Sequence, residues 1–406
     1  MANVSSSNGL EKYPKLRFKG FTEPWKTVRI GDVYAERSER GAEDMELLSV
    51  TMNDGVKMRS DIEGKDNSSE DKSNYKIVRA GDMVYNSMRM WQGANGISPW
   101  DGIVSPAYTV LKPRMSISNG FFAALFKTHR LINEFRKNSQ GMTSDTWNLK
   151  YPQIETIKTC IPVLAEQEKI ADFLIALDQR IEKQRTLVEH LKKYKRGAIE
   201  AIFNRTISFS SNTEDSWKEF RLGEFARRIT RKNGQATDIP LTISAQYGLI
   251  DQREFFSKTV ASSDMSGYYL LHKGEFAYNR STSSEYPFGS IKRLDKYDKG
   301  AVSTLYLCFD ANEEIMDSDF IMWYFESSRW HNGVREICAE GARNHGLLNV
   351  PTAGFFDTVH YLPSNKAEQK RIAAFLSTID ERYTRAFSEL EELNNLKNGL
   401  YQRLFI

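Results

Sequence analysis

Two long stretches of the sequence repeat apolar positions in strict seven-residue order. Eight of ten such positions in the first stretch, and nine of ten in the second, are apolar or Ala. Those that we expect in the interface are Ile170, Leu174, Leu177, Ile181, Val188 and Leu191 in the first, and Ile372, Leu376, Ile379, Tyr383, Leu390 and Leu393 in the second. A sustained seven-residue period is typical of a coiled-coil seam. We therefore predict two long helices, at 163–205 and 365–406, that pack antiparallel against each other.

The segments 16–162 and 206–364 show short apolar runs bounded by Gly, Pro and polar residues. Such runs favour short strands, which we expect at 77–78, 82–85, 107–111, 276–278 and 304–309. Longer amphipathic patterns favour helices at 121–135 and 320–330. Each segment is therefore predicted to be a globular domain with both helices and strands. A polar N-terminal arm at 1–15 precedes the first of them.

The two halves of the chain repeat each other. The stretch Ala165–Ala171 returns as Ala367–Ala373, 202 residues later. The stretch Gly81–Asn86 is similarly matched by Gly274–Asn279. A repeat of this length indicates a duplicated domain-plus-helix unit. The fold class is therefore predicted to be α+β, with two pseudo-repeated globular α/β domains joined by two long antiparallel coiled-coil helices.

The composition of the 406 residues favours a soluble protein with room for two or three domains, at 27% charged residues and a mean hydropathy of −0.53. Neither a membrane-spanning apolar run nor an N-terminal secretory pattern occurs, so we expect a cytoplasmic protein. Cys160, Cys308 and Cys338 are few and far apart, which favours plain buried thiols over disulfides or a zinc site.

Charge divides unevenly between the two globular segments. Residues 16–160 hold 21 Lys and Arg against 18 Asp and Glu, whereas residues 206–364 hold 17 against 21. Neither segment has the basic excess of a lone nucleic-acid binder. Any role in binding nucleic acid must therefore use local basic patches, or a partner must neutralise many of the phosphates.

Several short motifs mark the domains and helices of the chain: Pro14–Phe18 followed by Trp25 and Gly31-Asp32, then Gly81-Asp82 with Tyr85-Asn86, and the helix starts after Pro162 and Pro363. In these motifs the whole chain resembles the specificity subunits of type I restriction-modification systems. The order of domain, helix, domain, helix is more specific than any of these motifs.

The resemblance implies a role for each part. Each globular segment would be a target recognition domain for one half-site of double-stranded DNA. The paired helices would set the spacer and dock two methyltransferase subunits, which restriction-translocase subunits would join. The chain itself would be non-catalytic and bind no cofactor or metal. S-adenosylmethionine, ATP and Mg would belong to the partner subunits.

DNA-reading residues are expected where the two repeats diverge in polar loops. Arg, Lys, Asn, Gln, Ser and Thr present the donors and acceptors that base edges require. The candidates in the first repeat are Ser87, Arg89, Gln92, Thr143, Ser144, Asn148 and Lys150. Those in the second are Arg280, Ser281, Thr282, Ser284, Arg343, Asn344 and His345, and Arg228, Arg231 and Lys232 are candidates for phosphate contact. For any single residue the alternative is an ordinary solvated turn.

Two other functions remain open at this point. A coiled-coil scaffold without any DNA role would show the same duplication and helices. Asp54 with Glu63 and Lys65 faintly resembles the metal site of a nuclease, although the stretch lies beside a polar loop and has no counterpart in the second repeat.

Overall fold

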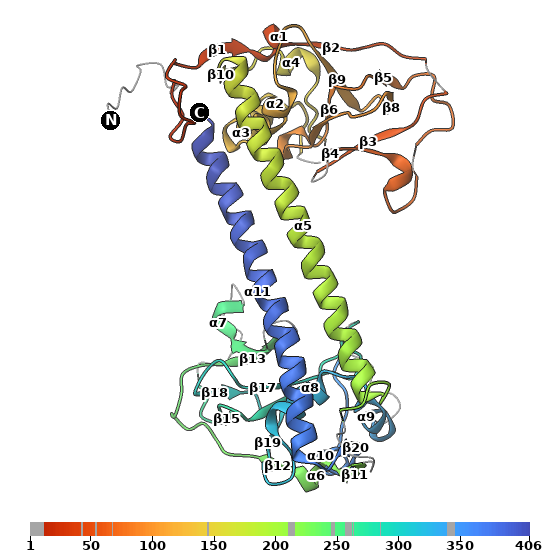
Figure 1. Cartoon of the computed structure of the whole chain (residues 1–406), viewed down its shortest axis with the longest axis vertical. Helices are drawn as coiled ribbons and strands as arrows, with labels where there is room; N and C mark the ends of the chain where they lie inside the picture. The colour runs from red at the N-terminus through yellow and green to blue at the C-terminus, as the bar shows by residue number, and fades with distance from the viewer. Residues whose placement is uncertain are drawn as a thin grey trace. The chain divides into compact units, whose positions relative to one another are not determined.

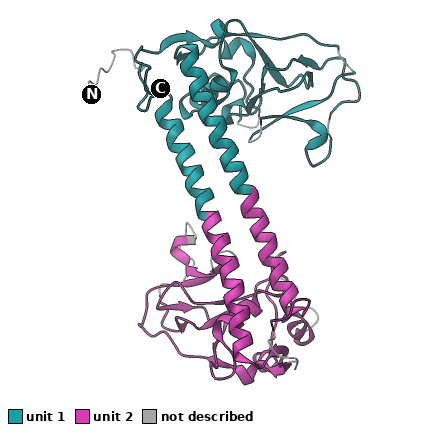
Figure 2. Cartoon of the chain, in the orientation of Figure 1, with its two compact units in different colours: residues 1–185, 388–406 teal, residues 186–387 magenta. Residues whose placement is uncertain are grey.

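The computed structural model describes residues 12–41, 44–52, 55–66, 68–143, 146–209, 216–244, 248–255, 262, 264–284, 286–338 and 346–406. The chain forms two compact units (Figure 2). Unit 1 comprises 1–185 and 388–406, and unit 2 comprises 186–387. The division cuts both long helices, each of which was predicted to be a segment of its own.

Each unit contains a four-stranded antiparallel sheet with the same strand order (Figure 1). In unit 1 the order is β2 (Tyr34–Glu36), β9 (Tyr108–Pro113), β6 (Met83–Asn86) and β7 (Asn95–Ile97). In unit 2 it is β12 (Ala226–Ile229), β19 (Leu307–Ala311), β16 (Phe276–Asn279) and β17 (Ser290–Arg293). The strands predicted at 82–85, 107–111, 276–278 and 304–309 lie in these sheets, which confirms them to within three residues.

Three further strand pairs repeat in each unit. In unit 1 they are β1 (Lys26–Arg29) with β10 (Lys158–Ile161), β3 (Leu48–Thr51) with β4 (Gly55–Met58), and β5 (Lys76–Val78) with β8 (Gly102–Val104). In unit 2 they are β11 (Trp217–Arg221) with β20 (Val359–Pro363), β13 (Leu241–Ser244) with β14 (Gly248–Asp251), and β15 (Tyr269–His272) with β18 (Lys299–Val302). The first pair of each unit ties its opening strand to the strand that precedes a long helix.

Short helices complete the two units. In unit 1 they are α1 (Ile30–Val33), α2 (Asn119–Leu125), α3 (His129–Asn138) and α4 (Tyr151–Ile154), with the 3₁₀ turns η1 (Arg59–Asp61) and η2 (Met90–Gln92). In unit 2 they are α6 (Leu222–Phe225), α7 (Gln252–Phe255), α8 (Ser318–Phe325), α9 (His331–Ile337) and α10 (Thr352–Asp357).

The single helices predicted at 121–135 and 320–330 are each wrong in one respect, because the chain bends at a hydroxyl residue. The Thr128 hydroxyl donates to the Leu125 carbonyl at 2.7 Å and accepts from the Leu131 amide, which ends α2 and starts α3. In unit 2 the Ser327 hydroxyl donates to the Tyr324 carbonyl at 2.6 Å, and α8 has already ended at Phe325. A local side-chain hydrogen bond thus outweighs the apolar periodicity.

The long helices α5 (Leu164–Phe203) and α11 (Lys366–Leu404) pack antiparallel, as predicted. Within unit 1, Asp178 pairs with Lys397 at 2.6 Å and Arg180 pairs with Glu389. Within unit 2, Asp380 pairs with Lys195 at 2.5 Å. Asp178 and Asp380 are equivalent in the sequence repeat, as are Lys195 and Lys397, so one ion pair occurs once in each unit.

The seam residues are buried or half-buried, as a coiled coil requires. Ile170, Leu174, Ile181, Val188, Ile372, Leu376 and Ile379 are at most 5% exposed, and Leu177, Leu191, Tyr383, Leu390 and Leu393 are half-buried.

Each unit also has two apolar clusters. The larger cluster of each unit continues onto its long helices, through Leu174 and Leu404 in unit 1 and through Ile202 and Ile372 in unit 2. Burial against these clusters therefore holds the helix ends to each unit.

Candidate nucleic-acid interface

The Gly-acid motif before β6 and β16 is a scaffold. Gly81 and Gly274 have φ of +91° and +92°, which glycine adopts without strain. In unit 1 the carboxylate of Asp82 accepts hydrogen bonds from Arg37 at 2.6 and 3.1 Å and from the Arg79 amide at 2.9 Å. These contacts fix the turn that leads into the central strand.

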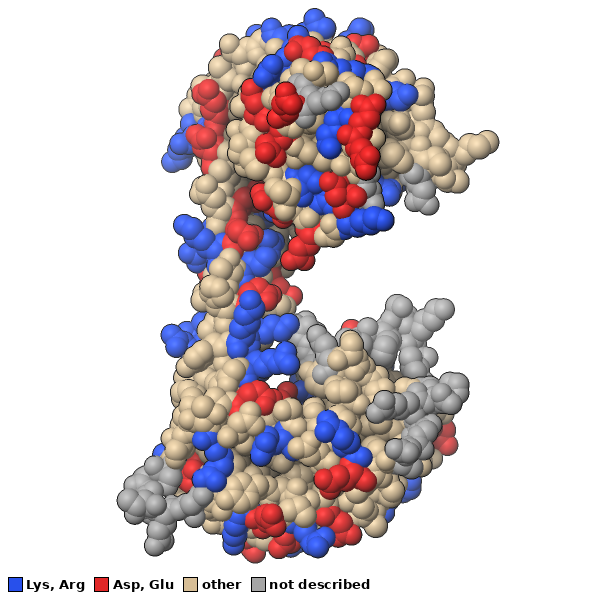
Figure 3. All heavy atoms as spheres, turned by 90° about the vertical axis from the view of Figure 1, so that its right-hand side faces the viewer, with Lys and Arg blue, Asp and Glu red and all other residues tan. Residues whose placement is uncertain are grey.

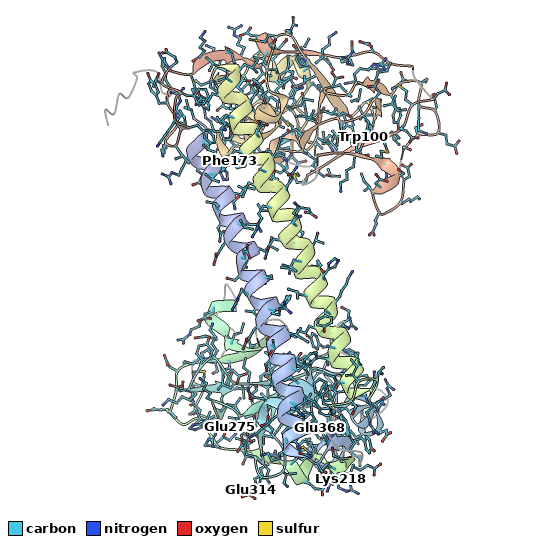
Figure 4. The ribbon with its side chains drawn as sticks, in the orientation of Figure 1. Trp100, Phe173, Lys218, Glu275, Glu314 and Glu368 are labelled. Carbon is cyan, nitrogen blue, oxygen red and sulfur yellow. The ribbon has the colours of Figure 1, made fainter. Side chains whose placement is uncertain are left out.

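The equivalent turn in unit 2 is closed in the same way by Glu275, which is labelled in Figure 4. Its carboxylate accepts from Arg231 at 2.6 Å and from the His272 amide at 2.6 Å. Arg231 also donates to the Leu270 carbonyl. A residue predicted to contact phosphate is therefore engaged in the scaffold of this structure.

The other two residues predicted to contact phosphate, Lys232 and Arg228, differ from Arg231 in their contacts. Lys232 donates to the Gly267 carbonyl at 2.9 Å and lies over the Tyr269 ring at 4.4 Å. Arg228 is exposed on β12. Of the three predicted phosphate contacts, Arg228 alone has an exposed guanidinium to which no hydrogen bond or ion pair is assigned in the described part of the chain.

The tyrosine that follows each scaffold motif is a buried core residue. Burial raises the pKa of Tyr85 and of Tyr278 well above the usual range of a phenol. The Tyr278 hydroxyl donates to the Phe288 carbonyl at 2.7 Å, and its ring stacks on Phe355. Both rings therefore stay neutral and support the loops beside them.

The loops after the two tyrosines each join a second candidate loop. In unit 1 the Leu149 amide donates to the Ser87 carbonyl at 2.8 Å. In unit 2 the Leu348 amide donates to the Arg280 carbonyl at 3.0 Å. These four residues hold matching places in the repeat. The fold thus brings together, twice and in the same way, loops that are about 60 residues apart in the sequence.

The candidate residues of unit 1 differ in exposure. Ser87 is 4% exposed and its hydroxyl lies 2.8 Å from that of Thr109, so in this structure it supports the loop and does not face solvent. Arg89 and Asn148 are half-buried. Gln92, Thr143 and Lys150 are exposed, and Ser144 lies outside the described residues.

A tryptophan pair holds the two loops of unit 1 together. The rings of Trp91 and Trp147 meet edge to face with centroids 5.2 Å apart, one ring from each loop. The Trp91 indole donates to the Met88 carbonyl at 3.1 Å. This pair was not predicted from the sequence, although two tryptophans in otherwise polar loops are a usable signal. Aromatic pairs of this geometry contribute about 0.5–1.5 kcal/mol beyond their burial.

Two candidate residues of unit 2 are held by main-chain carbonyls. Arg280 donates to the Leu305 carbonyl at 2.9 and 3.2 Å, and Thr282 donates to the Gly346 carbonyl at 3.2 Å. Ser281 and Ser284 are exposed. Arg343, Asn344 and His345 lie outside the described residues, directly before the segment that pairs with Ser281 and Thr282.

The repeated Glu-Gln motif proves to be a structural joint at the start of each long helix. Gln167 accepts from the Ser118 amide at 3.1 Å and donates to the Pro162 carbonyl at 2.9 Å. Gln369 accepts from the Asp317 amide and donates to the Pro363 carbonyl, both at 2.8 Å. Ser118 and Asp317 cap α2 and α8, so each glutamine links a long helix, a strand end and a core helix.

The described residues include neither a metal-binding cluster nor a membrane-spanning helix. In that part of the chain, no group of three or more His, Cys, Asp or Glu side chains could hold a metal ion. Of the nuclease-like residues, Glu63 and Lys65 are exposed, and Asp54 lies outside the described residues. The helices described include none long and apolar enough to cross a membrane.

Comparison with known proteins agrees with the repeated architecture. Residues 22–190 match a family model described as the type I restriction modification DNA specificity domain. The crystal structure of a type-I restriction-modification system S subunit from M. genitalium covers 97% of this chain and 99% of its own, with 12% identity and a TM-score of 0.59. A chain from a study of complex assembly and conformational transition of the type I R-M system covers 95% and 98%, with 15% identity and a TM-score of 0.54. The family match spans the first repeat, and the fold is shared over nearly the whole chain.

Proposed function

We propose that this chain, whose residues 22–190 match the model of the type I restriction modification DNA specificity domain, selects the DNA sequence on which a type I restriction-modification complex acts. Unit 1 binds one half of a bipartite duplex target and unit 2 binds the other half. The chain is non-catalytic. Methylation and cleavage are carried out by partner subunits, which supply S-adenosylmethionine, ATP and Mg.

One observation carries this proposal: each unit joins the same two loops on the same frame, but fills them with different side chains. The Leu149–Ser87 and Leu348–Arg280 hydrogen bonds are equivalent, whereas Trp91 and Trp147 of unit 1 correspond to Ser284 and Gly346 of unit 2. A frame kept constant under varied loops suits two binding surfaces of different specificity. A pure scaffold would have no need of this difference.

The paired helices have two roles in the proposal. They set the spacer between the two half-sites, and they dock two methyltransferase subunits, which restriction-translocase subunits join. Linking two modules raises affinity only when the linker matches the span between their sites. A stiff antiparallel pair therefore makes the spacing between half-sites part of the specificity.

Selection from random duplexes tests the proposal. The full chain, assembled with its methyltransferase partner, is expected to enrich a two-part motif with a fixed gap. Enrichment of no motif, or of one uninterrupted motif, would contradict it. A coiled-coil scaffold without DNA reading predicts the first of these outcomes.

The tryptophan pair provides a test specific to unit 1. The double variant Trp91→Ala, Trp147→Ala frees the two loops from each other, so selectivity should fall at one half-site only, by about 1–3 kcal/mol per affected base pair. The same selection measures this change. Trp100→Ala is a matched control, because Trp100 is 37% exposed in the turn between β7 and β8. Equal loss at both half-sites would refute the assignment of one unit to one half-site.

The spacing role is tested by lengthening both helices. One heptad inserted after Val188 and another after Phe387 would extend the pair by about 10 Å, at about 1.5 Å per residue. Since duplex DNA rises about 3.4 Å per base pair, the preferred gap should grow by about three base pairs while both half-sites stay the same. An unchanged gap would refute the spacing role.

A further inference from the structure

A basic run in α5 has no part in the helix seam or in the recognition loops. Lys192, Lys193 and Arg196 are exposed within the segment of α5 that belongs to unit 2. Tyr194 lies among them with 57% of its surface exposed. Figure 3 shows Lys and Arg side chains gathered on the helical part of the molecule that faces the viewer.

The three exposed cations have no assigned partner within the described residues, unlike the lysine between them. Lys195 pairs with Asp380 at 2.5 Å and lies over the Trp323 and Tyr383 rings. No ion pair or side-chain hydrogen bond is assigned to Lys192, Lys193 or Arg196 in that part of the chain. Lys195 therefore serves the seam, whereas the other three present their charge to solvent.

The second long helix shows that the fold does not require these charges. The residues of α11 that correspond to Lys192, Lys193 and Arg196 in the repeat are Asn394, Asn395 and Asn398. Asn395 and Asn398 are exposed as well. Equivalent places in the same kind of helix pair are thus neutral in one repeat and carry three positive charges in the other.

This difference in charge between α5 and α11 favours duplex DNA over a protein subunit as the partner of the basic run. A protein subunit that docks in the same way on both repeats would meet three cations on α5 and three asparagines on α11, where Glu392 also takes the place of His190. One complementary surface cannot fit both. Duplex DNA has no such difficulty, because it carries about one negative charge per 1.7 Å of its axis and each Lys or Arg that contacts a phosphate releases counterions.

We propose that Lys192, Lys193 and Arg196 of α5 form a contact site for DNA phosphates, which strengthens binding without reading bases. The inference rests on the proposed function, since it takes duplex DNA as the ligand. It assigns a DNA-binding role to one helix of the pair and not to the other. Contacts to phosphates place a protein on the duplex but carry no sequence information directly.

The test exchanges the three cations for the residues of the other repeat. The variant Lys192→Asn, Lys193→Asn, Arg196→Asn is assembled with the methyltransferase partner and titrated with a duplex that carries the selected motif, at several salt concentrations. The slope of log K against log salt should become shallower by up to about 2.7, at about 0.9 per phosphate contact. The selected motif should not change.

Two further variants make the test specific. Lys192→Gln, Lys193→Gln, Arg196→Gln removes the same charges with a better helix former and should act alike, which excludes loss of helix as the cause. Lys370→Asn, Arg382→Asn, Arg385→Asn removes three exposed charges from the α11 segment of unit 2 and should leave the slope nearly unchanged.

Three outcomes would overturn the inference. The first is an unchanged slope in the α5 variants, and the second is an equal change in the α11 control. The third is loss of assembly with the methyltransferase partner in the absence of DNA, which would make the run a protein-docking site. Failure of the proposed function looks different, because the unaltered complex would then select no bipartite motif at all.

Discussion

Unit 1 and unit 2 treat two adjacent residues of the same motif differently. Gln167 and Gln369 make the same two hydrogen bonds, each to the cap of a core helix and to a proline carbonyl. Glu166 beside the first is held by Arg17, whereas Glu368 beside the second is held by Ser216 and by the Trp217 indole. The glutamine, which joins secondary structures, therefore has the same kinds of partner in both units. The glutamate, which faces a variable segment, has different partners in the two units.

The same division extends to the cores and loops. Each unit repeats its sheet order, its hydroxyl-containing helix break and its seam ion pair. The units differ in individual side-chain contacts. Unit 1 has the Trp91–Trp147 pair, and unit 2 has the buried His360. The contacts that recur hold the turns, the helix ends and the helix seam, whereas the side-chain contacts of the variable loops differ between the units.

The first prediction tests whether the two glutamine joints are equivalent, by removing one at a time. Gln167→Leu and Gln369→Leu each leave a partly buried amide and a buried carbonyl without a partner, so each should lower the stability of its own unit by about 2–4 kcal/mol. The two shared hydrogen bonds predict losses of similar size, slightly larger for Gln369, which also donates to the Ile315 carbonyl at 3.3 Å. Hydrogen exchange resolved along the chain measures each unit, and the exposed Gln179→Leu is the control. A large loss in one unit only would show that the joints are not equivalent.

The second prediction concerns pH and unit 2 alone. Burial lowers the pKa of His360 to about 4. The Thr358 hydroxyl donates to the Phe355 carbonyl, so it accepts from Nε2 of His360, and Nδ1 is left to accept from the Tyr324 hydroxyl. The imidazole is therefore held neutral, and the equivalent residue of unit 1 is Thr159.

The sign of the effect follows from where the proton binds. Between about pH 6.5 and pH 4 the unfolded chain binds a proton that the folded unit does not. The contribution of His360 is thus complete above pH 6.5 and is lost as the pH falls towards 4, by on the order of 3 kcal/mol. Between pH 7 and pH 5, hydrogen exchange should show unit 2 losing about 2 kcal/mol of this contribution, at about 1.36 kcal/mol per pH unit below 6.5, and His360→Thr should abolish the loss. If His129→Thr, at an exposed site in unit 1, abolished the same pH dependence, the assignment would be wrong.

The third and smallest effect compares the seam ion pairs. Both are partly exposed, so Lys195→Met and Lys397→Met should each cost less than about 1 kcal/mol. Lys195 should cost slightly more, because it lies 5.2 and 5.7 Å from two aromatic rings and Lys397 lies 5.8 Å from one. Thermal unfolding of the two variants measures the difference. Lys193→Met, on the exposed face of α5, serves as the control, and a larger cost for Lys397→Met would contradict the argument.

The regular parts of the fold were predictable from the sequence. The seven-residue pattern located both long helices within two residues, and the repeat predicted that both halves would share one architecture. The breaks before α3 and α9 were not predicted, because a single hydroxyl bond decides them within an otherwise helical pattern.

The sequence could locate the candidate loops, but it could not tell which of their side chains face solvent. Gln92, Thr143, Lys150, Ser281 and Ser284 lie exposed on the expected loops, and their contact with DNA stays a prediction. The sequence gives no sign that Ser87 is buried or that Arg280 and Arg231 bond to carbonyls of distant segments. The Trp91–Trp147 contact likewise joins residues 56 positions apart.

The sequence by itself determined the duplication, the two helices and the places where the repeats diverge, because periodicity and self-similarity are properties of residue order. Only the tertiary structure decided which polar side chains face solvent and which support the frame. Leu305 and Val350, whose carbonyls accept from Arg280, are far from it in the chain and next to it in the folded unit. A donor satisfied by such a contact no longer needs water or a ligand, and that is settled by packing.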